Sequence, residues 1–256
     1  MMKEIRVWAL MLVAWSIALP SGAAFAAEVR VAVASNFLLP LKALAQKFEK
    51  TSGDTLRISA GSTGKHYAQI VNGAPFDVFL AANEREPQRL EQAGLGVAGS
   101  RFTYALGRLV LWAPELKDDQ PDMVAVLKAG DYRRIAVANP TAAPYGAAAL
   151  EVLDKLGLKS QLQGKIIQGE SIGQTYQYVA SGAAEMGFVA LAQLKGQGDF
   201  ARGKHWLIDA GLHAPMRQQA LLLKTAEYNP AAKRFLQFLQ SERGRMAIEQ
   251  FGYGLE

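Results

Sequence analysis

Small polar residues gather at four places where an apolar, β-branched run gives way to a helical pattern. These segments are 34–36 (ASN), 61–64 (GSTG), 139–146 (NPTAAPYG) and 170–173 (ESIG). Ser, Thr and Asn at such places often only cap the free N–H groups of a helix's first turn. Where several helix starts converge, their free N–H groups and positive dipole ends can hold one anion. Ligands of α/β sheets bind beyond the carboxyl ends of the strands, where all four segments fall, so the set predicts an anion-binding site.

The four segments carry almost no ionised side chain. Glu170 is the exception within them, and Lys65 follows the second segment directly. A protonated oxyanion such as phosphate needs an acceptor for its proton, typically a carboxylate, because a buried unpaired O–H is costly. An anion that is fully ionised at neutral pH needs donors only, so the pattern favours molybdate, tungstate or sulfate. An amino-acid ligand would need an Arg and an acidic partner, and no such pair stands out.

Apolar runs alternate with helical patterns along the chain, which predicts an α/β fold with mostly parallel strands. Strands are expected at 29–34, 56–60, 78–81, 135–138, 166–167, 186–191 and 218–223, with a long strand at 102–112 that Gly107 interrupts. Helices are expected at 37–48, 64–71, 145–156, 173–180 and 230–251, the last broken near Gly244. These elements place the four polar segments at strand-to-helix junctions.

Two long strand segments, around 102–112 and 216–224, flank a complete α/β unit. If both pass between lobes, the second lobe is inserted into the first. The expected division is then lobe 1 at 27–108 and 217–256, and lobe 2 at 109–216. A cleft between two lobes is a preferred location for a small ligand.

The first 26 residues have the pattern of a secretory signal peptide. Lys3 and Arg6 precede an apolar run at 7–19, and 24–26 (AFA) offers small residues for a signal peptidase near Ala26. The apolar run of about 13 residues is shorter than the roughly 20 that a membrane-spanning helix needs. No Cys follows it, which argues against a lipoprotein. We therefore expect an exported protein of the periplasm whose mature chain begins at Ala27.

Composition excludes several other classes. The formal net charge of +5 is scattered along the 256 residues, so no nucleic-acid footprint stands out. The absence of Cys excludes disulfides and thiol chemistry. The three His residues are widely spaced, so neither direct metal ligands nor a cofactor is expected.

Two motifs suggest other chemistry. Residues 169–173 (GESIG) fit the nucleophile elbow of hydrolases, which leaves a secreted serine hydrolase using Ser171 as an alternative. That reading needs a later acid and His, and neither His205 nor His213 has an obvious acid partner. Residues 94–99 (GLGVAG) fit a dinucleotide-binding pattern but follow a helical segment, which indicates a loop.

The chain resembles the molybdate-binding proteins of ABC-type molybdate importers. The resemblance runs in order through 31–37, 59–84, 99–112, 139–158, 170–191 and 235–253. Its most diagnostic stretches are GAPFDVFLAANE and ASGAAEMGFVAL. It therefore covers essentially the whole chain beyond the signal peptide.

The resemblance implies a type II periplasmic binding protein fold, with two lobes and two crossover strands. The anion would lie in the cleft, held by neutral hydrogen-bond donors, and would then be delivered to an ABC permease in the inner membrane. Tungstate should bind about as well as molybdate, and cavity size alone would reject sulfate; another oxyanion such as sulfate is the alternative ligand. The protein is expected to act as a monomer and not as an enzyme.

The resemblance also implies the ligand-binding residues. By position they are Ser35, Asn36, Ser62, Thr63, Tyr145 and Ile172, the last through its backbone N–H. One branch of the family has a Tyr donor where this sequence has Ala190. As in another branch, Tyr145 is expected to supply the phenolic donor instead.

Overall fold

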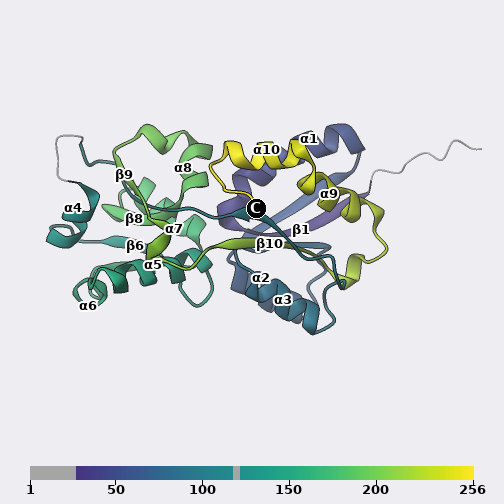
Figure 1. Cartoon of the computed structure of the whole chain (residues 1–256), viewed down its shortest axis with the longest axis horizontal. Coiled ribbons are helices and arrows are strands. Elements are labelled where there is room, and N and C mark those ends of the chain that lie inside the picture. The colour runs from purple at the N-terminus through teal and green to yellow at the C-terminus, as the bar shows by residue number, and fades with distance from the viewer. Residues whose placement is uncertain (1–26, 118–121) are drawn as a thin grey trace, which may run out of the picture.

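Two five-stranded sheets organise the chain, each at the centre of its own lobe (Figure 1). The computed structural model describes residues 27–117 and 122–256, and the predicted signal peptide lies outside the described residues. The strand orders are β2-β1-β3-β10-β4 in the first sheet and β7-β6-β8-β5-β9 in the second. The predicted two-lobed α/β fold is confirmed.

The first lobe contains the N-terminal strands and the C-terminal helices. Its strands are β1 (Glu28–Ala34), β2 (Thr55–Gly61), β3 (Val78–Leu80), β4 (Phe102–Leu106) and β10 (Arg217–Leu222). Its helices are α1 (Leu38–Ser52), α2 (Thr63–Val71), α3 (Arg85–Gln92), α9 (Pro230–Gln240) and α10 (Glu242–Gln250). Figure 1 shows α1, α9 and α10 on one side of the sheet, and α2 and α3 on the other.

The second lobe is built from the middle of the chain. Its strands are β5 (Leu109–Ala113), β6 (Ile135–Ala138), β7 (Ile166–Gly169), β8 (Met186–Ala190) and β9 (Lys204–Leu207). Its helices are α4 (Met123–Ala129), α5 (Pro144–Lys155), α6 (Lys159–Leu162), α7 (Ile172–Ala180) and α8 (Leu191–Gln197).

The chain crosses between the lobes twice, at neighbouring places. It leaves the first sheet at the end of β4 and enters the second at β5, through Gly107 and Arg108. It returns through 208–216 into β10, and the N–H of Gly107 donates to the carbonyl oxygen of Met216 over 2.9 Å, so the crossovers are bonded to each other. The strands that flank the crossovers, β4, β5, β9 and β10, pair antiparallel with their neighbours. In contrast, β1 pairs parallel with β2 and β3, and β6 pairs parallel with β7 and β8. The predominance of parallel strands therefore holds only for the part of each sheet away from the crossovers.

Alternating residues of the central strands build a core on each face of each sheet. In β1, Val29, Val31 and Val33 pack with α1, α9 and α10, while Ala32 faces α2 and α3. In β5, Leu109 and Leu111 pack with α5, while Trp112 stacks on Tyr176 of α7 at 5.6 Å. Each large apolar side chain buried in this way contributes about 1.5–3 kcal/mol. Each sheet thus has cores on both of its faces, and the small residues Ala34, Ala82 and Ala192 join the cores of the two lobes where the lobes meet.

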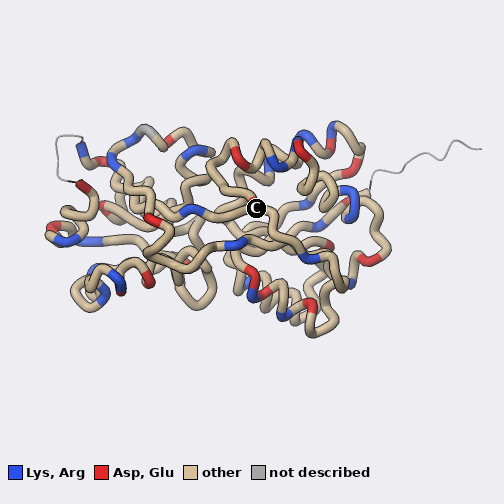
Figure 2. Tube along the Cα trace, in the orientation of Figure 1, with Lys and Arg blue, Asp and Glu red and all other residues tan. Residues whose placement is uncertain are grey.

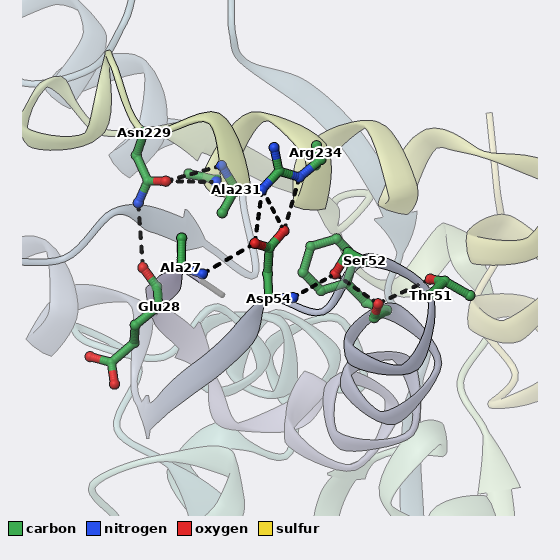
Figure 3. Close-up of polar contacts among 10 residues, drawn as sticks. Ala27, Glu28, Thr51, Ser52, Asp54, Asn229, Ala231 and Arg234 are labelled. Atoms are coloured by element: carbon green, nitrogen blue, oxygen red, sulfur yellow. Dashed lines mark hydrogen bonds and ion pairs between the residues drawn. The ribbon is translucent and has the colours of Figure 1, made fainter. Parts of the chain in front are cut away.

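A buried carboxylate ties together three parts of the first lobe (Figure 3). Asp54, in the turn before β2, accepts two hydrogen bonds from the guanidinium of Arg234 in α9, at 2.8 and 2.9 Å. It also accepts one from the backbone N–H of Ala27 at 3.3 Å. The start of the described chain is thereby fixed against the C-terminal helices.

The C-terminal helical segment is broken near Gly244, as predicted. The break falls at Ser241, because Ser241 adopts an extended conformation and its hydroxyl caps α10 by accepting from the N–H of Gly244 at 3.2 Å. Figure 2 shows basic and acidic residues interspersed over both lobes. In the described ranges, no helix combines the length and the apolar character needed to cross a membrane.

Candidate anion-binding site

All six residues predicted to contact the ligand line one small cavity between the lobes. The lining is Ala34, Ser35, Asn36, Gly61, Ser62, Thr63, Ala82, Ala143, Pro144, Tyr145 and Ile172. The cavity is small, with room for about one water molecule, and it excludes an extended solute.

The start of α2 brings two hydroxyl groups to the cavity. Ser62 precedes the helix in an extended conformation, but its side chain makes no capping hydrogen bond, and within the described chain its hydroxyl has no partner. The Thr63 hydroxyl accepts from the N–H of Ala82 at 3.0 Å and keeps its own proton to donate. Both side chains are buried. Capping alone therefore does not explain this Ser-Thr pair.

The start of α7 presents a backbone donor. The next three N–H groups of the helix all have acceptors. The N–H of Gly173 donates to the Ser35 hydroxyl, that of Gln174 to the Ser171 hydroxyl, and that of Thr175 to the Ser171 carbonyl oxygen. The N–H of Ile172 has no partner among the residues that the structure describes. The free donor of this helix start is thus the one predicted. The Ser171 hydroxyl acts as the cap of α7, which is the ordinary structural role and not that of a nucleophile.

Tyr145 reaches the cavity from the first turn of α5. A Cβ on Gly146 would lie 2.1 Å from the carbonyl oxygen of Ala138, so glycine is required for α5 to begin this close to β6. The Tyr145 hydroxyl accepts from the side-chain amide of Gln218 at 3.1 Å and retains a proton. Burial raises the pKa of Tyr145 well above the ordinary value of 10.0. The phenol is therefore a neutral donor throughout the physiological pH range.

Asn36 has a different role from the one its position suggests. Its side-chain nitrogen donates to the Gln218 carbonyl oxygen at 2.8 Å and to the Tyr253 hydroxyl at 2.9 Å. Both side-chain donors are thus used inside the protein, and in the described ranges two groups of Asn36 have no partner, its buried side-chain oxygen and its backbone N–H. A contact from Asn36 to a ligand would come from this N–H.

Three residues that were not predicted to belong to the site, Gln218, Tyr253 and Tyr104, complete the buried network behind the cavity. Gln218 has no exposed surface, and its carbonyl oxygen also accepts from the Tyr104 hydroxyl at 3.0 Å. A Cβ on Gly107 would lie 2.6 Å from the Tyr145 hydroxyl and 2.7 Å from the Gln218 nitrogen. The signal in the sequence was the pair of glutamines at 218–219 in an otherwise apolar strand.

The cavity lining contains no Asp, Glu, Lys, Arg or His. The residues that the structure describes also hold no group of three or more His, Cys, Asp and Glu side chains that could bind a metal ion. Ala190 lies outside the cavity. Beside it, the Gln193 side chain bonds the Ala190 N–H at 2.9 Å and the Ile172 carbonyl at 3.0 Å. The site is a set of neutral hydrogen-bond donors supplied by both lobes.

Two lobes, two adjacent crossovers and a polar cavity between them define a solute-binding protein of the two-lobed class. The family described as bacterial extracellular solute-binding protein matches residues 29–254, and the chain belongs to that family.

Three comparisons show which members the chain is similar to. It is 48% identical to the molybdate-binding protein ModA of Azotobacter vinelandii, over 91% of this chain and 92% of that protein. It is 43% identical to the ModA protein of Rhodobacter capsulatus, over 94% and 92%. The solved structure of the Azotobacter vinelandii periplasmic molybdate-binding protein superposes with a TM-score of 0.85 at 41% identity, covering 89% of this chain and 99% of that one. These relatives are binding proteins, and the chain is accordingly a binding protein and not an enzyme.

Proposed function

We propose that this chain is the periplasmic solute-binding component of an ABC importer and that its ligand is molybdate. The observation that carries the proposal is the cavity, which is lined by neutral donors from both lobes and by no charged side chain. Two similar proteins support the choice of ligand, because both are named molybdate-binding proteins and both are more than 40% identical to this chain.

The donor set explains why the ligand should be a fully ionised oxyanion. The hydroxyls of Ser62, Thr63 and Tyr145 and the N–H groups of Asn36 and Ile172 can all donate, and no carboxylate is present to accept a proton. A protonated oxyanion such as hydrogen phosphate would find no carboxylate there to accept its O–H, and a buried O–H left unpaired costs about 1–3 kcal/mol. Tungstate has the same charge and shape as molybdate and should bind about as well, whereas sulfate is smaller and would contact fewer of the donors.

The remaining parts of the proposal concern the whole protein. Residues 1–26 would direct export and be removed near Ala26. The lobes would comprise 27–108 with 217–256, and 109–216. The monomeric protein would close on the anion and dock on an inner-membrane permease through the surfaces of both lobes.

A thermal-shift assay with molybdate, tungstate, sulfate and phosphate tests the ligand. A ligand at a hundred times its Kd stabilises the folded state by about 2.7 kcal/mol, which raises the unfolding temperature measurably. We expect a shift with molybdate and tungstate and none with phosphate. A shift with sulfate or phosphate and none with molybdate would refute the choice of ligand.

A further inference from the structure

The two helices that begin at the cavity share one feature that the ligand contacts do not explain. Each has glycine as its second residue, Gly64 in α2 and Gly173 in α7. Each glycine donates its N–H across the cleft: Gly64 to the carbonyl oxygen of Ala142 at 2.8 Å, and Gly173 to the Ser35 hydroxyl at 3.0 Å. One bond runs from the first lobe to the second, and the other runs from the second to the first.

Neither glycine is required by its own backbone. Gly64 and Gly173 are absent from the glycines with positive φ, and both lie in helices, where glycine is a poor former compared with alanine. Local structure therefore favours alanine at both positions, so the reason for glycine lies elsewhere.

The missing Cβ atoms account for the choice. On Gly64, a Cβ would lie 3.0 Å from the Cα and 3.2 Å from the carbonyl oxygen of Ala142. On Gly173, a Cβ would lie 3.1 Å from the Cβ and 3.2 Å from the hydroxyl oxygen of Ser35. In both cases the nearest atoms belong to the opposite lobe, and the distances are shorter than ordinary van der Waals contact.

We propose that Gly64 and Gly173 are positioning residues whose lack of a side chain lets the two lobes close fully on the anion. This inference rests on the proposed function. The two helix starts can reach one small anion together only if the lobes meet backbone to backbone beside it. A methyl group at either position holds its helix start back by a few tenths of an ångström and weakens the donors of that lobe.

The test compares Gly64→Ala, Gly173→Ala and the double variant with Gly164→Ala, a matched control. Gly164 lies in the second lobe without positive φ, and a Cβ there meets nothing within 4 Å. By isothermal titration with molybdate, we expect a Kd about tenfold higher for each single variant. Overpacking of this kind typically changes an equilibrium constant by about tenfold or more. The double variant should bind molybdate more weakly than either single variant, and the Gly164→Ala control should bind it as the wild type does.

Two further measurements locate the effect. Crystal structures with molybdate should show the distances from Ala142 to residue 64 and from Ser35 to residue 173 longer in the double variant than in the wild type by a few tenths of an ångström. Ligand-free unfolding temperatures should not fall, because the tight contacts of the added methyl groups are with the opposite lobe, and the one contact within a lobe, from position 173 to the Ser171 hydroxyl at 3.5 Å, is of ordinary van der Waals length.

Several outcomes would overturn the inference. These are wild-type affinity in the double variant, weaker binding with unchanged distances between the lobes at residues 64 and 173, or a lower ligand-free unfolding temperature, which would place the clash within one lobe. If the wild type itself does not bind molybdate, the proposed function fails. If the wild type binds and the alanine variants bind equally well, only the closure role fails.

Discussion

The side-chain amide of Gln218 donates a hydrogen bond to the phenolic oxygen of Tyr145 over 3.1 Å. Gln218 lies in β10 of the first lobe, just after the second crossover, and Tyr145 belongs to α5 of the second lobe. Because Asn36 and Tyr104 donate to its carbonyl oxygen, the orientation of the Gln218 amide is determined. The Tyr145 oxygen therefore accepts a hydrogen bond from Gln218, and its own O–H can donate to a ligand.

Replacement of Tyr145 by Phe should weaken molybdate binding by about 1–3 kcal/mol, because one donor to a buried charged acceptor is lost. The ring would still fill its place, so the fold should be kept. Isothermal titration gives the affinity, and circular dichroism gives the control for folding. An unchanged Kd would mean that the phenol serves the interlobe network only.

Replacement of Thr63 by Ala should also weaken binding by about 1–3 kcal/mol. The N–H of Ala82 would lose its acceptor at the same time, so some loss of stability is expected. Thr63→Ser keeps the hydroxyl and is the matched control, which should bind nearly as well as the wild type. If Ser and Ala at this position bind equally, the hydroxyl does not contact the anion.

Replacement of Ile172 by Val should leave the Kd within about twofold, because only the backbone N–H is expected to contact the ligand. Loss of one buried methylene should lower the free energy of unfolding by about 0.5–1.5 kcal/mol. Chemical denaturation and titration measure the two effects separately. A loss of binding out of proportion to the loss of stability would contradict the backbone role.

The free energy of unfolding should fall on acidification because of His66. Burial lowers the pKa of His66 below the ordinary value of 6.5, despite a hydrogen-bonded contact to Gln69 at 3.0 Å. The folded state therefore holds fewer protons than the unfolded state. Stability from this group is complete above about pH 6.5 and is lost as the pH falls below it.

Urea unfolding of the wild type and of His66→Gln, at about pH 7.5 and 5.5, checks this sign. The wild type should lose more stability between the two values than the variant does. Equal losses would assign the acid sensitivity to other groups.

Replacement of Asp54 by Asn should lower the free energy of unfolding by about 1–3 kcal/mol, the range for hydrogen bonds to a charged group. The carboxylate is buried, whereas the Arg234 side chain remains 47% exposed and can be solvated when its partner is lost. The molybdate Kd should be unchanged, because Asp54 lies outside the cavity lining. A weaker Kd would show that the contact acts on the site as well as on stability.

The cavity residues were predictable because each lies where a strand ends and a helix begins. Ser62, Thr63 and Ile172 stand at such junctions, where the local pattern alone indicates free donors facing one edge of a sheet. Their convergence followed from the parallel pairing of β1 with β2 and of β6 with β7.

The network behind the cavity was not predictable in this way. Asn36 bonds Gln218 and Tyr253 across 182 and 217 positions of sequence, so no local pattern records these contacts. The break in the C-terminal helix was predictable to within a few residues, near Gly244, but the residue that makes it, Ser241, is identified only by the hydrogen bond of its capping hydroxyl.

The neutral lining of the cavity has a consequence for release of the anion. Since no carboxylate, ammonium, guanidinium or imidazole group lines it, no group there has to gain or lose a proton when the lobes separate. Water can replace the hydroxyl and N–H donors one by one. For the proposed ligand, unloading is then a mechanical event that is insensitive to the proton gradient, and the anion leaves with its full double negative charge for the permease to accommodate.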